Sequence, residues 1–329
     1  MRRRFAEAGR RAFLWQALAV ALLLLGGWWV AGRVEGELAA RGIRSGFGFL
    51  LQPAGFEIGE SLFDFHAGLA YWQAFLVGFA NTLRVALPGL LLATVLGALI
   101  GFARLSPNFL LRALGTAYVE VFRNVPLLLQ LLTWYFLLTE KLPPVADAVE
   151  FLPGFFLSKS GLAFPLPAFA VAAGELAWPQ RGLLNIEGGA TVTPEYLAVL
   201  LGLAAYSAAY LAEIVRAGIL SVPRGQVEAA AALGLTARQR LRWVVLPQAL
   251  RLIVPPAGNQ YLNLTKNSSL AVVVGYPDLV SVANTTLNQT GQAVECIAIL
   301  IAVYLALSLA TAALLALYNA RLLRRGSAA

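Results

Sequence analysis

Long apolar segments separated by polar ones run through most of the chain. A helix that crosses a bilayer needs about 20 mostly apolar residues. Segments that reach or approach this length lie at 13–32, 85–103, 126–139 with its upstream extension, 196–212, 252–264 continuing past Lys266, and 297–318. The pattern predicts an all-α fold, a polytopic transmembrane helical bundle of about six helices.

The composition agrees with a membrane protein, since 59% of the residues are hydrophobic and only 13% are charged. The same pattern predicts the division of the chain. We expect an N-terminal cytoplasmic tail and anchor helix at 1–34, an extracytoplasmic loop at 35–73, a transmembrane domain at 74–320 and a cytoplasmic tail at 321–329. Inside the transmembrane domain, an extracytoplasmic insertion at 140–194 and a cytoplasmic loop at 223–247 interrupt the apolar pattern.

The net charge of +8 raises the possibility of a nucleic-acid partner, and the placement of the charges argues against it. If six spans alternate from a cytoplasmic N-terminus, most basic residues fall on the inner side, as the positive-inside rule expects. We therefore expect cytoplasmic N- and C-termini and no nucleic acid. The first apolar segment follows Arg2, Arg3 and Arg4 but lacks a clear small-residue cleavage site, so we interpret it as a retained anchor.

The insertion at 140–194 carries prolines at 143, 144, 153, 165, 167 and 179 within an otherwise apolar run. Proline removes a backbone donor and breaks helices. The apolar part at 166–178 is too short for a comfortable span, so we expect a re-entrant or interfacial segment with Trp178 at the lipid–water boundary. His66 is the only histidine and Cys296 the only cysteine, so neither a metal site nor an intramolecular disulfide is expected.

The stretch EAAAALGLTARQRLRWVVLP, at 228–247, differs from the apolar sequence around it. Good helix formers precede Gly234, which can end a helix in the left-handed conformation, and Thr236 with Gln239 makes a capping box. The stretch predicts a helix, a bend and a second helix. Four alanines give the first helix a nearly bare surface, and Arg238, Arg240 and Arg242 keep the segment in the cytoplasm. On composition alone, it is an ordinary cytoplasmic loop.

The spacing of residues in this stretch points to a specific kind of loop. It resembles the EAA loop of permease subunits of ATP-binding-cassette importers, with Glu-Ala-Ala at 228–230, Gly234, nine residues, Val244, one residue and Leu-Pro at 246–247. The other matching motifs are NTL at 81–83, ARLS at 103–106, YVEVFRNVPLLLQL at 118–131, AYLAEIVRAGILSVPRGQVEAAAALGL at 209–235 and LPQALRLIVPPAGNQYLNLTKNSSL at 246–270. Together they resemble the polar-amino-acid branch of these permeases. The loop QPAGFEIGESL at 52–62 is similar to that of the Q-type permease of the general L-amino acid importer.

This resemblance implies the fold of a type I importer permease, the subunit that lets amino acids cross a bacterial inner membrane. Two permease chains pair, two ATPase subunits bind beneath them, and a periplasmic binding protein delivers the solute. The chain has no G-x-x-x-x-G-K-[ST] loop, so ATP and Mg²⁺ are expected on the separate ATPase, with no cofactor and no enzymatic activity in this chain. The resemblance to the Q-type permease favours a second permease of different sequence.

The same resemblance makes the EAA loop the contact with the ATPase. The residues expected at that contact are Glu228, Ala229, Ala230 and Gly234. Arg224, Arg238 and Arg242 are weaker candidates, because cytoplasmic arginines more often act as topology anchors.

Polar groups at membrane depth cost several kcal/mol unless they have partners, so each is a hypothesis for the substrate path. The candidates are Glu120, Arg123, Asn124, Lys266, Asn267, Ser268 and Ser269. Glu120 and Arg123 stand at i and i+3, so an intrahelical ion pair is the simpler interpretation. Alternatively, the carboxylate and ammonium groups of an α-amino acid could bind to these polar side chains. Residues 266–269 could also be a helix break that lines a cavity with backbone groups.

Two other functions compete with this interpretation. An ion-coupled secondary transporter would use Glu120, Arg123 and Lys266 without ATP, but the inverted repeats typical of that class are not found. A channel or scaffold would not need the EAA spacing. The sequence does not specify which amino acids pass or whether the permease pair is homo- or heterodimeric.

Overall fold

The computed structural model describes residues 46–167, 176–182 and 185–326, with positions 15–16, 18–22, 25–29, 32–33 and 36–37 before them, and side chains up to residue 318. The predicted first span, 13–32, lies partly outside these residues. The helices after it are α2 (Tyr71–Ala103), α3 (Phe109–Asn124), α4 (Leu127–Phe136), α5 (Pro194–Leu220), α6 (Arg224–Ala232), α7 (Ala237–Arg240), α8 (Leu246–Asn267), α9 (Leu279–Thr290) and α10 (Ala293–Gly326). Short 3₁₀ segments form at η1 (Phe47–Leu51), η3 (Val145–Asp147) and η5 (Ser268–Val274), and π-helical turns at η2 (Leu137–Lys141) and η4 (Leu241–Val245).

Three helices of the described residues are long and apolar enough to cross a bilayer: α2, α5 and α10. Two further pairs meet the same test only as bent spans. One joins α3 to α4–η2 with a bend of 105°, and the other joins the α7–η5 run to α9 with a bend of 52°. The polytopic helical bundle predicted from hydropathy is therefore confirmed, with up to five spans in this part of the chain.

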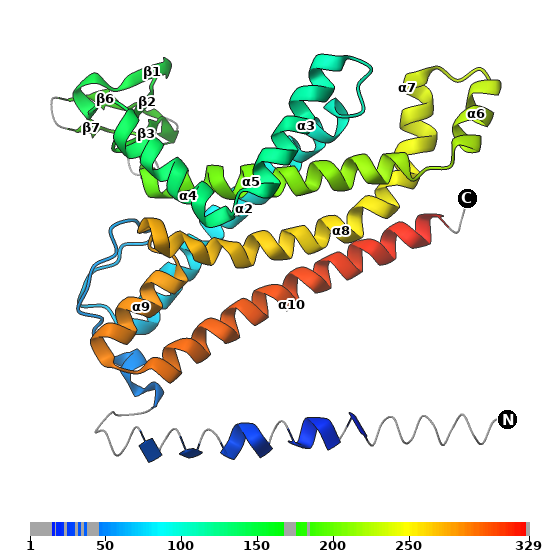
Figure 1. Cartoon of the computed structure of the whole chain (residues 1–329). Coiled ribbons are helices and arrows are strands. Elements are labelled where there is room, and N and C mark those ends of the chain that lie inside the picture. Colours follow the sequence, from blue (N-terminus) through cyan, green and yellow to red (C-terminus); the bar gives the residue numbers. More distant parts are fainter. Residues whose placement is uncertain are drawn as a thin grey trace.

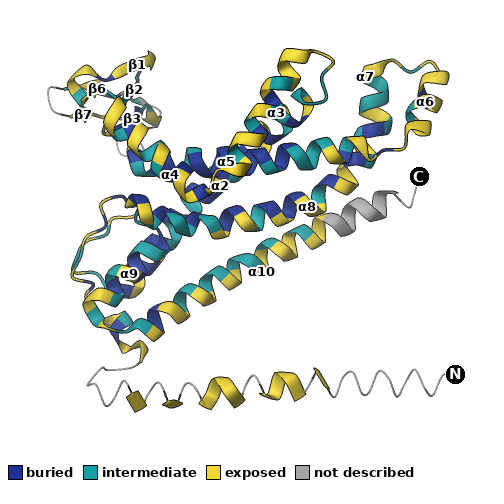
Figure 2. Cartoon of the chain, viewed as in Figure 1, coloured by how far each residue is buried: buried dark blue, intermediate teal, exposed yellow. Residues whose placement is uncertain are grey.

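Among the described elements, α2 and α5 pack against each other most extensively, and α5 runs through their middle with a largely buried surface (Figures 1 and 2). Glycine makes this approach possible. A Cβ added to Gly97 would lie 2.6 Å from the Leu211 Cβ, and one added to Gly101 would lie 2.9 Å from the Ala212 carbonyl oxygen. The two backbones are thus too close for a side chain at either position.

The insertion forms short antiparallel strands at the end of the helices opposite α6 and α7 (Figure 1). A four-stranded sheet has the order β1-β2-β3-β8, and two smaller pairs are β4 with β5 and β6 with β7. The strands are β1 (Val149–Leu152), β2 (Phe155–Ser158), β3 (Gly161–Phe164), β4 (Leu166–Pro167), β5 (Leu176–Ala177), β6 (Gln180–Arg181), β7 (Ile186–Glu187) and β8 (Ala190–Val192).

The insertion forms strands at the described ends of 166–178, where a re-entrant or interfacial segment is predicted, and the place of Trp178 at the lipid–water boundary stays a prediction. Both described ends of that segment are strands that pair with each other, Leu166 with Ala177 and Pro167 with Leu176, and residues 168–175 lie outside the described part. The physical reason is local. Prolines stop helix formation, and Gly154 (φ 75°) and Gly161 (φ 108°) take conformations that suit the bends of a β meander.

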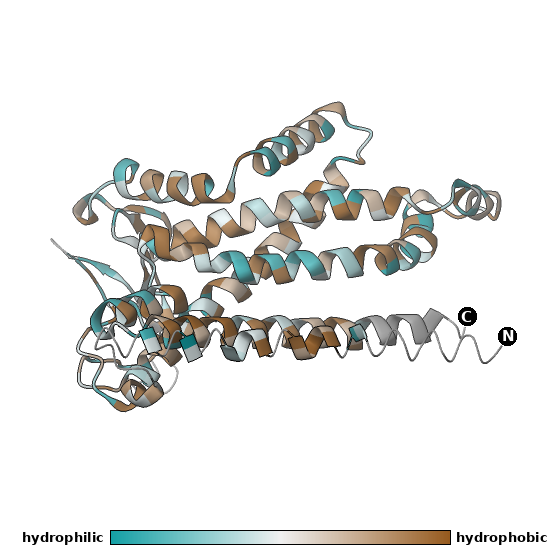
Figure 3. Cartoon of the chain, turned by 60° about the horizontal axis from the view of Figure 1, so that its bottom comes forward, coloured by the Kyte–Doolittle hydropathy of each residue, from teal (hydrophilic) through white to brown (hydrophobic). Residues whose placement is uncertain are grey.

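Helix α10 packs against α8 and α9 on one side and leaves much of its surface exposed (Figure 2), and this helix, which leads to the C-terminus, is mostly hydrophobic (Figure 3). In a chain that crosses a bilayer, such a surface suits lipid or a partner helix.

Polar contacts fasten α2 to α5 at both ends. At the end near the sheet, Arg84 Nη1 of α2 lies 2.7 Å from Glu60 Oε1, and the Thr193 hydroxyl donates to Glu60 Oε2 at 2.5 Å. Thr193 is also the N-cap of α5 and accepts from the Tyr196 backbone N–H at 3.1 Å. Glu60 therefore links the loop before α2, α2 itself and the start of α5.

The NTL motif at 81–83 belongs to the same outer cluster. The Asn81 side-chain amide donates to the carbonyl oxygens of Glu60 (2.7 Å) and Pro277 (2.9 Å), and the Thr82 hydroxyl accepts from the Leu279 backbone N–H at 3.1 Å. These bonds satisfy buried backbone groups at the start of α9. The motif thus joins α2 to the α8–α9 connection.

At the opposite end, Arg104 directly after α2 forms an ion pair with Glu213 of α5. Arg216, one turn later on α5, holds the same carboxylate with Nη2 at 2.5 Å and Nε at 3.2 Å. One carboxylate thus joins two cations from two helices. The arginine of the ARLS motif at 103–106 is therefore a structural residue.

Burial raises the pKa of the Glu60 carboxyl above its ordinary value of 4.5, the neighbouring Glu195 adds to this, and Thr193 and Arg84 act in the opposite direction. The folded protein therefore keeps this proton to a higher pH than the unfolded chain. We predict that the unfolding free energy of the wild type relative to Glu60→Gln falls as the pH rises from about 4 to about 7. Denaturant unfolding of the two proteins at each pH measures this difference. A difference that grows with pH would show that attraction to Arg84 outweighs burial.

Candidate functional site

The segment 224–243, here called the elbow, has the predicted helix, bend and helix. Helix α6 ends at Ala232 with Leu233 as its C-cap, and Gly234 follows in the left-handed conformation (φ 80°). The Gly234 N–H donates to the Ala231 carbonyl (2.9 Å) and the Leu235 N–H to the Ala230 carbonyl (3.2 Å). These two bonds form a Schellman motif, which satisfies carbonyl groups that a helix end leaves free.

The second helix begins at the predicted capping box. The Thr236 N–H donates to Gln239 Oε1 at 2.9 Å, and the Gln239 N–H donates to the Thr236 hydroxyl at 3.4 Å. Arg240 Nη1 then donates to the Leu235 carbonyl at 3.0 Å, which ties the second helix back to the bend. The angle of the elbow is thus fixed by hydrogen bonds on both sides of Gly234.

The outer surface of the elbow carries most of the predicted contact residues. Glu228, Ala229 and Gly234 are exposed, as are Arg224, Arg238 and Arg242. Ala230 is different, because only 5% of its surface is exposed and it packs inward. A small residue at position 230 is therefore needed for packing inside the protein, which corrects its assignment to the outer surface.

Sequence reasoning missed two apolar residues on this surface. Leu233, at the end of α6, is 82% exposed, and Trp243 in η4 is also exposed. Large exposed apolar side chains on an otherwise polar loop mark contact surfaces. The available signal was an apolar residue directly before the helix-ending glycine.

The elbow joins two core helices. It follows α5 through Val222 and leads through Val245 into α8, and both valines belong to the main buried core. Gln248 Nε2 of α8 also donates to Gln226 Oε1 of α6 at 2.7 Å. A force on the exposed surface therefore acts directly on the first turns of α8.

The candidates at membrane depth form two groups. Glu120, Arg123 and Asn124 are exposed at the end of α3, where the chain turns by 105° into α4.

The turn between α3 and α4 is held by a side chain, because Pro126 has no N–H to donate to the Phe122 carbonyl. Gln130 Nε2 donates to this carbonyl at 2.9 Å and to the Val125 carbonyl at 2.8 Å, which stabilises the turn.

The predicted ion pair between Glu120 and Arg123 does not form. Asn124 donates to Glu120 Oε2 at 3.3 Å, and the Arg123 guanidinium carbon lies 5.1 Å from the centroid of the Tyr210 ring on α5. The Tyr206 hydroxyl donates to that of Tyr210 at 3.2 Å. A cation–π contact with a neighbouring helix thus replaces the ion pair. The two tyrosines were not predicted, because the contact joins residues far apart in the sequence.

Residues 266–269 contain the expected change in the helix. Helix α8 ends at Asn267 and continues as the 3₁₀ segment η5. The Ser268 hydroxyl donates to the Thr265 carbonyl and the Ser269 hydroxyl to the Lys266 carbonyl, both at 2.7 Å, whereas the Lys266 side chain is exposed. Within the described residues, no ion pair or side-chain hydrogen bond connects this group with 120–124. The structure therefore shows two separate polar groups.

Comparisons with known proteins agree with this geometry. Residues 93–324 match the family described as "Binding-protein-dependent transport system inner membrane component". The chain is 41% identical to the general L-amino acid transport system permease protein AapQ of Rhizobium johnstonii, over 95% of this chain and 92% of that one. It is 42% identical to the putative amino-acid ABC transporter permease protein YhdX of Escherichia coli, over 97% and 95% of the two chains.

A solved structure extends the agreement to the fold. The structure described as an amino acid ABC transporter with histidines is 27% identical and covers 76% of this chain and 95% of its own, with a TM-score of 0.56. The resemblance inferred from the EAA loop is confirmed, and with it the prediction that this chain is a transport permease rather than an enzyme. The chain belongs to the family of binding-protein-dependent transport system inner membrane components, the permeases of ATP-binding-cassette importers.

Proposed function

We propose that this chain is a permease subunit through which amino acids enter a bacterial cell across the inner membrane. The elbow is the observation that carries the proposal: a rigid, exposed bend with an apolar side chain at its tip and a direct connection to a core helix. The amino-acid permeases that match nearly the whole chain support the same class of solute. The elbow then faces the cytoplasm, in agreement with the arginines around it.

A separate ATPase supplies the energy in this proposal. Leu233 and the exposed alanines of α6 enter an apolar recess of the ATPase, and Glu228 pairs with a cation there. ATP and Mg²⁺ bind to that subunit, whose closure pushes the elbow and, through Gln226 and Gln248, the start of α8. A second permease of different sequence completes the pore, and a periplasmic binding protein docks at the end that carries the β-strands.

The substrate path passes the bend between α3 and α4. An α-amino acid carries one carboxylate and one ammonium group. Arg123 offers a cation that no carboxylate in the described residues neutralises, and Glu120 and Asn124 lie within one turn of it. These groups fit a zwitterion better than the serines at 268 and 269, whose hydroxyls donate to backbone carbonyls.

The family membership argues against the ion-coupled secondary transporter that the sequence left open, in which Glu120, Arg123 and Lys266 act without ATP. Uptake into proteoliposomes that contain the purified complex separates the two. ATP-driven import requires ATP on the ATPase side and persists without an ion gradient, whereas a secondary transporter shows the reverse.

Substitutions at Gly234 test whether the elbow docks on the ATPase. A Cβ at this position meets no atom within 4 Å, so Gly234→Ala adds only backbone strain of about 1 kcal/mol. Gly234→Asp adds a charge that must be desolvated in the docked complex. We expect Gly234→Asp to lower uptake of labelled amino acids by about tenfold or more, and Gly234→Ala to retain most of it. Uptake that survives Gly234→Asp unchanged would contradict the docking of this surface.

Substitutions of Arg123 test whether this side chain lies on the substrate path. Replacing Arg123 by Gln removes the cation, and replacing it by Lys keeps it, so we expect the KM for amino-acid uptake to rise about tenfold in Arg123→Gln and much less in Arg123→Lys. ATP hydrolysis without solute serves as the control, because the elbow is unchanged in both variants. An unchanged KM in Arg123→Gln would remove Arg123 from the path.

A further inference from the structure

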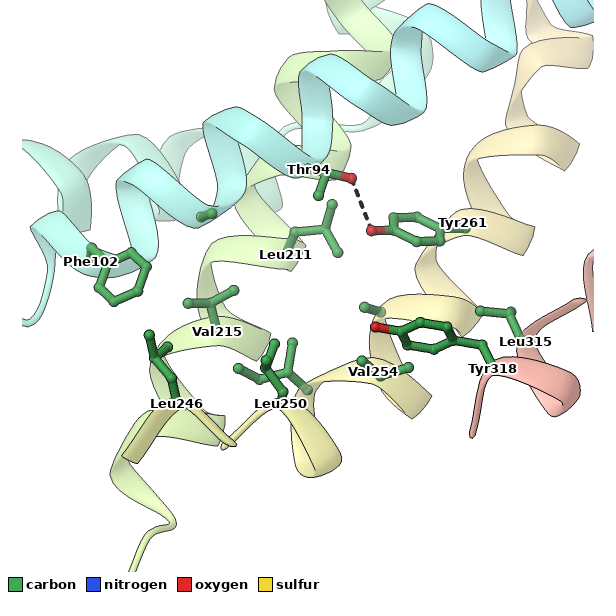
Figure 4. Close-up of a pocket in the computed structure, with 13 residues that line it drawn as sticks. Thr94, Phe102, Leu211, Val215, Leu246, Leu250, Val254, Tyr261, Leu315 and Tyr318 are labelled. Carbon is green, nitrogen blue, oxygen red and sulfur yellow. Dashed lines mark hydrogen bonds between the residues drawn. The ribbon is translucent and has the colours of Figure 1, made fainter. Parts of the chain in front are cut away.

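A cavity of about 500 Å³ lies between α2, α5, α8 and α10, in the half of the bundle nearer the elbow (Figure 4). Its lining contains no charged residue. The Thr94 and Tyr261 hydroxyls lie 2.9 Å apart, and Thr94 also donates to the Leu90 carbonyl at 2.7 Å. A zwitterion would find no ionic partner here, so the cavity is separate from the proposed substrate path.

The size and walls of the cavity suit a hydrocarbon. Apolar cavities of about 150 Å³ already bind small apolar molecules, and this one falls within the usual range of ligand sites. Leu211, Val215 and Ile253 form part of its wall. Three of its residues, Phe102, Leu250 and Tyr318, are also exposed on the outside of the chain. The exposed rim is thus apolar or aromatic, which suits an opening toward lipid rather than water.

Arginines stand next to the wall residues of α8 in the sequence. Arg242 precedes the wall residue Leu246 by four positions, Arg251 follows the wall residue Leu250 directly, and both arginines are exposed. Helix α10 continues after Tyr318 through three more arginine positions, at 321, 324 and 325. The surface of a cytoplasmic leaflet is rich in anionic lipids, which attract basic residues close to it.

We propose that the cavity binds one acyl chain of an anionic phospholipid of the elbow-side leaflet, with the headgroup on the elbow side, where Arg242 and Arg251 supply positive charge. The apolar walls take the chain and the arginines attract the anionic headgroup, so the lipid matches the site at both ends. Leu246 and Leu250 belong to the first turns after the elbow, so the lipid contacts the part of α8 that the elbow moves. This inference rests on the membrane-spanning fold and does not depend on the solute that is transported.

Photo-crosslinking tests the site. The full complex is reconstituted in nanodiscs of phosphatidylethanolamine with a phosphatidylglycerol probe that carries a diazirine near the end of one acyl chain, and labelled residues are identified by mass spectrometry. We expect labels concentrated on cavity residues such as Val215 and Ile253. Ala98→Phe fills the cavity and should reduce this labelling by about tenfold, because several buried methylene groups of the chain lose their site. Ala313→Phe adds the same side chain to an exposed position of α10 outside the cavity and should leave the labelling unchanged.

The headgroup has its own test in the same complex. A phosphatidylcholine probe with the same diazirine should label the cavity less than the phosphatidylglycerol probe, and Arg242→Gln with Arg251→Gln should remove this preference. Labels spread evenly over the exposed surface of α10, or undiminished in Ala98→Phe, would overturn the proposal. An absence of cavity labels in the wild type would do so without any variant and would indicate that protein side chains fill the space.

Discussion

The close packing of α2 on α5 is the constraint on which the rest of the structure depends. The two backbones approach at Gly97 and Gly101, where a side chain would collide with the opposite helix. Each end of the pair is then fastened by a carboxylate that faces an arginine, Glu60 at Arg84 and Glu213 at Arg104. Glycine contacts in the middle and ionic contacts at the ends leave little freedom for the two helices to slide.

The α2–α5 pair is a fixed reference for the elements around it. The elbow leaves α5 at one end and enters α8 at the other, and its angle is held by the Schellman motif at Gly234 and the capping box at Thr236. In the proposed function, a push on the exposed surface changes the position of α8 relative to α2 and α5. The apolar cavity lies between these helices, so a lipid chain in it would fill space that the movement of α8 changes.

The sequence was informative wherever structure depends on nearby residues. Hydropathy located the apolar helices α2, α5 and α10, and the order of alanines, Gly234 and Thr236 predicted the elbow down to its capping box. Local patterns could not show through-space partners. Arg104 and Glu213 are 109 positions apart, and Arg123 stacks on a tyrosine of another helix instead of pairing within its own. The β-strands of the insertion were missed because prolines and short apolar runs also fit a re-entrant segment.

Several residues that resemble family motifs prove to be structural. Asn81 and Thr82 bond backbone groups at the start of α9, and Arg104 holds α2 to α5. Ala230 likewise serves internal packing, whereas Leu233, which no part of the EAA pattern specifies, is exposed at the tip of the elbow. A motif therefore combines residues that build the scaffold with residues that meet a partner, and only the folded structure separates them.

The most direct test of this account is a pair of distances measured by pulsed electron paramagnetic resonance in the complex with its ATPase. Spin labels replace the exposed residues Leu87 on α2 and Leu220 on α5 in one protein, and Leu87 and the exposed Ala237 of the elbow in another, while the buried Cys296 is replaced by serine. The account predicts that adding ATP changes the distance from Leu87 to Ala237 and leaves the distance from Leu87 to Leu220 unchanged. If the two distances change together, or neither changes, the elbow does not move against a fixed α2–α5 pair.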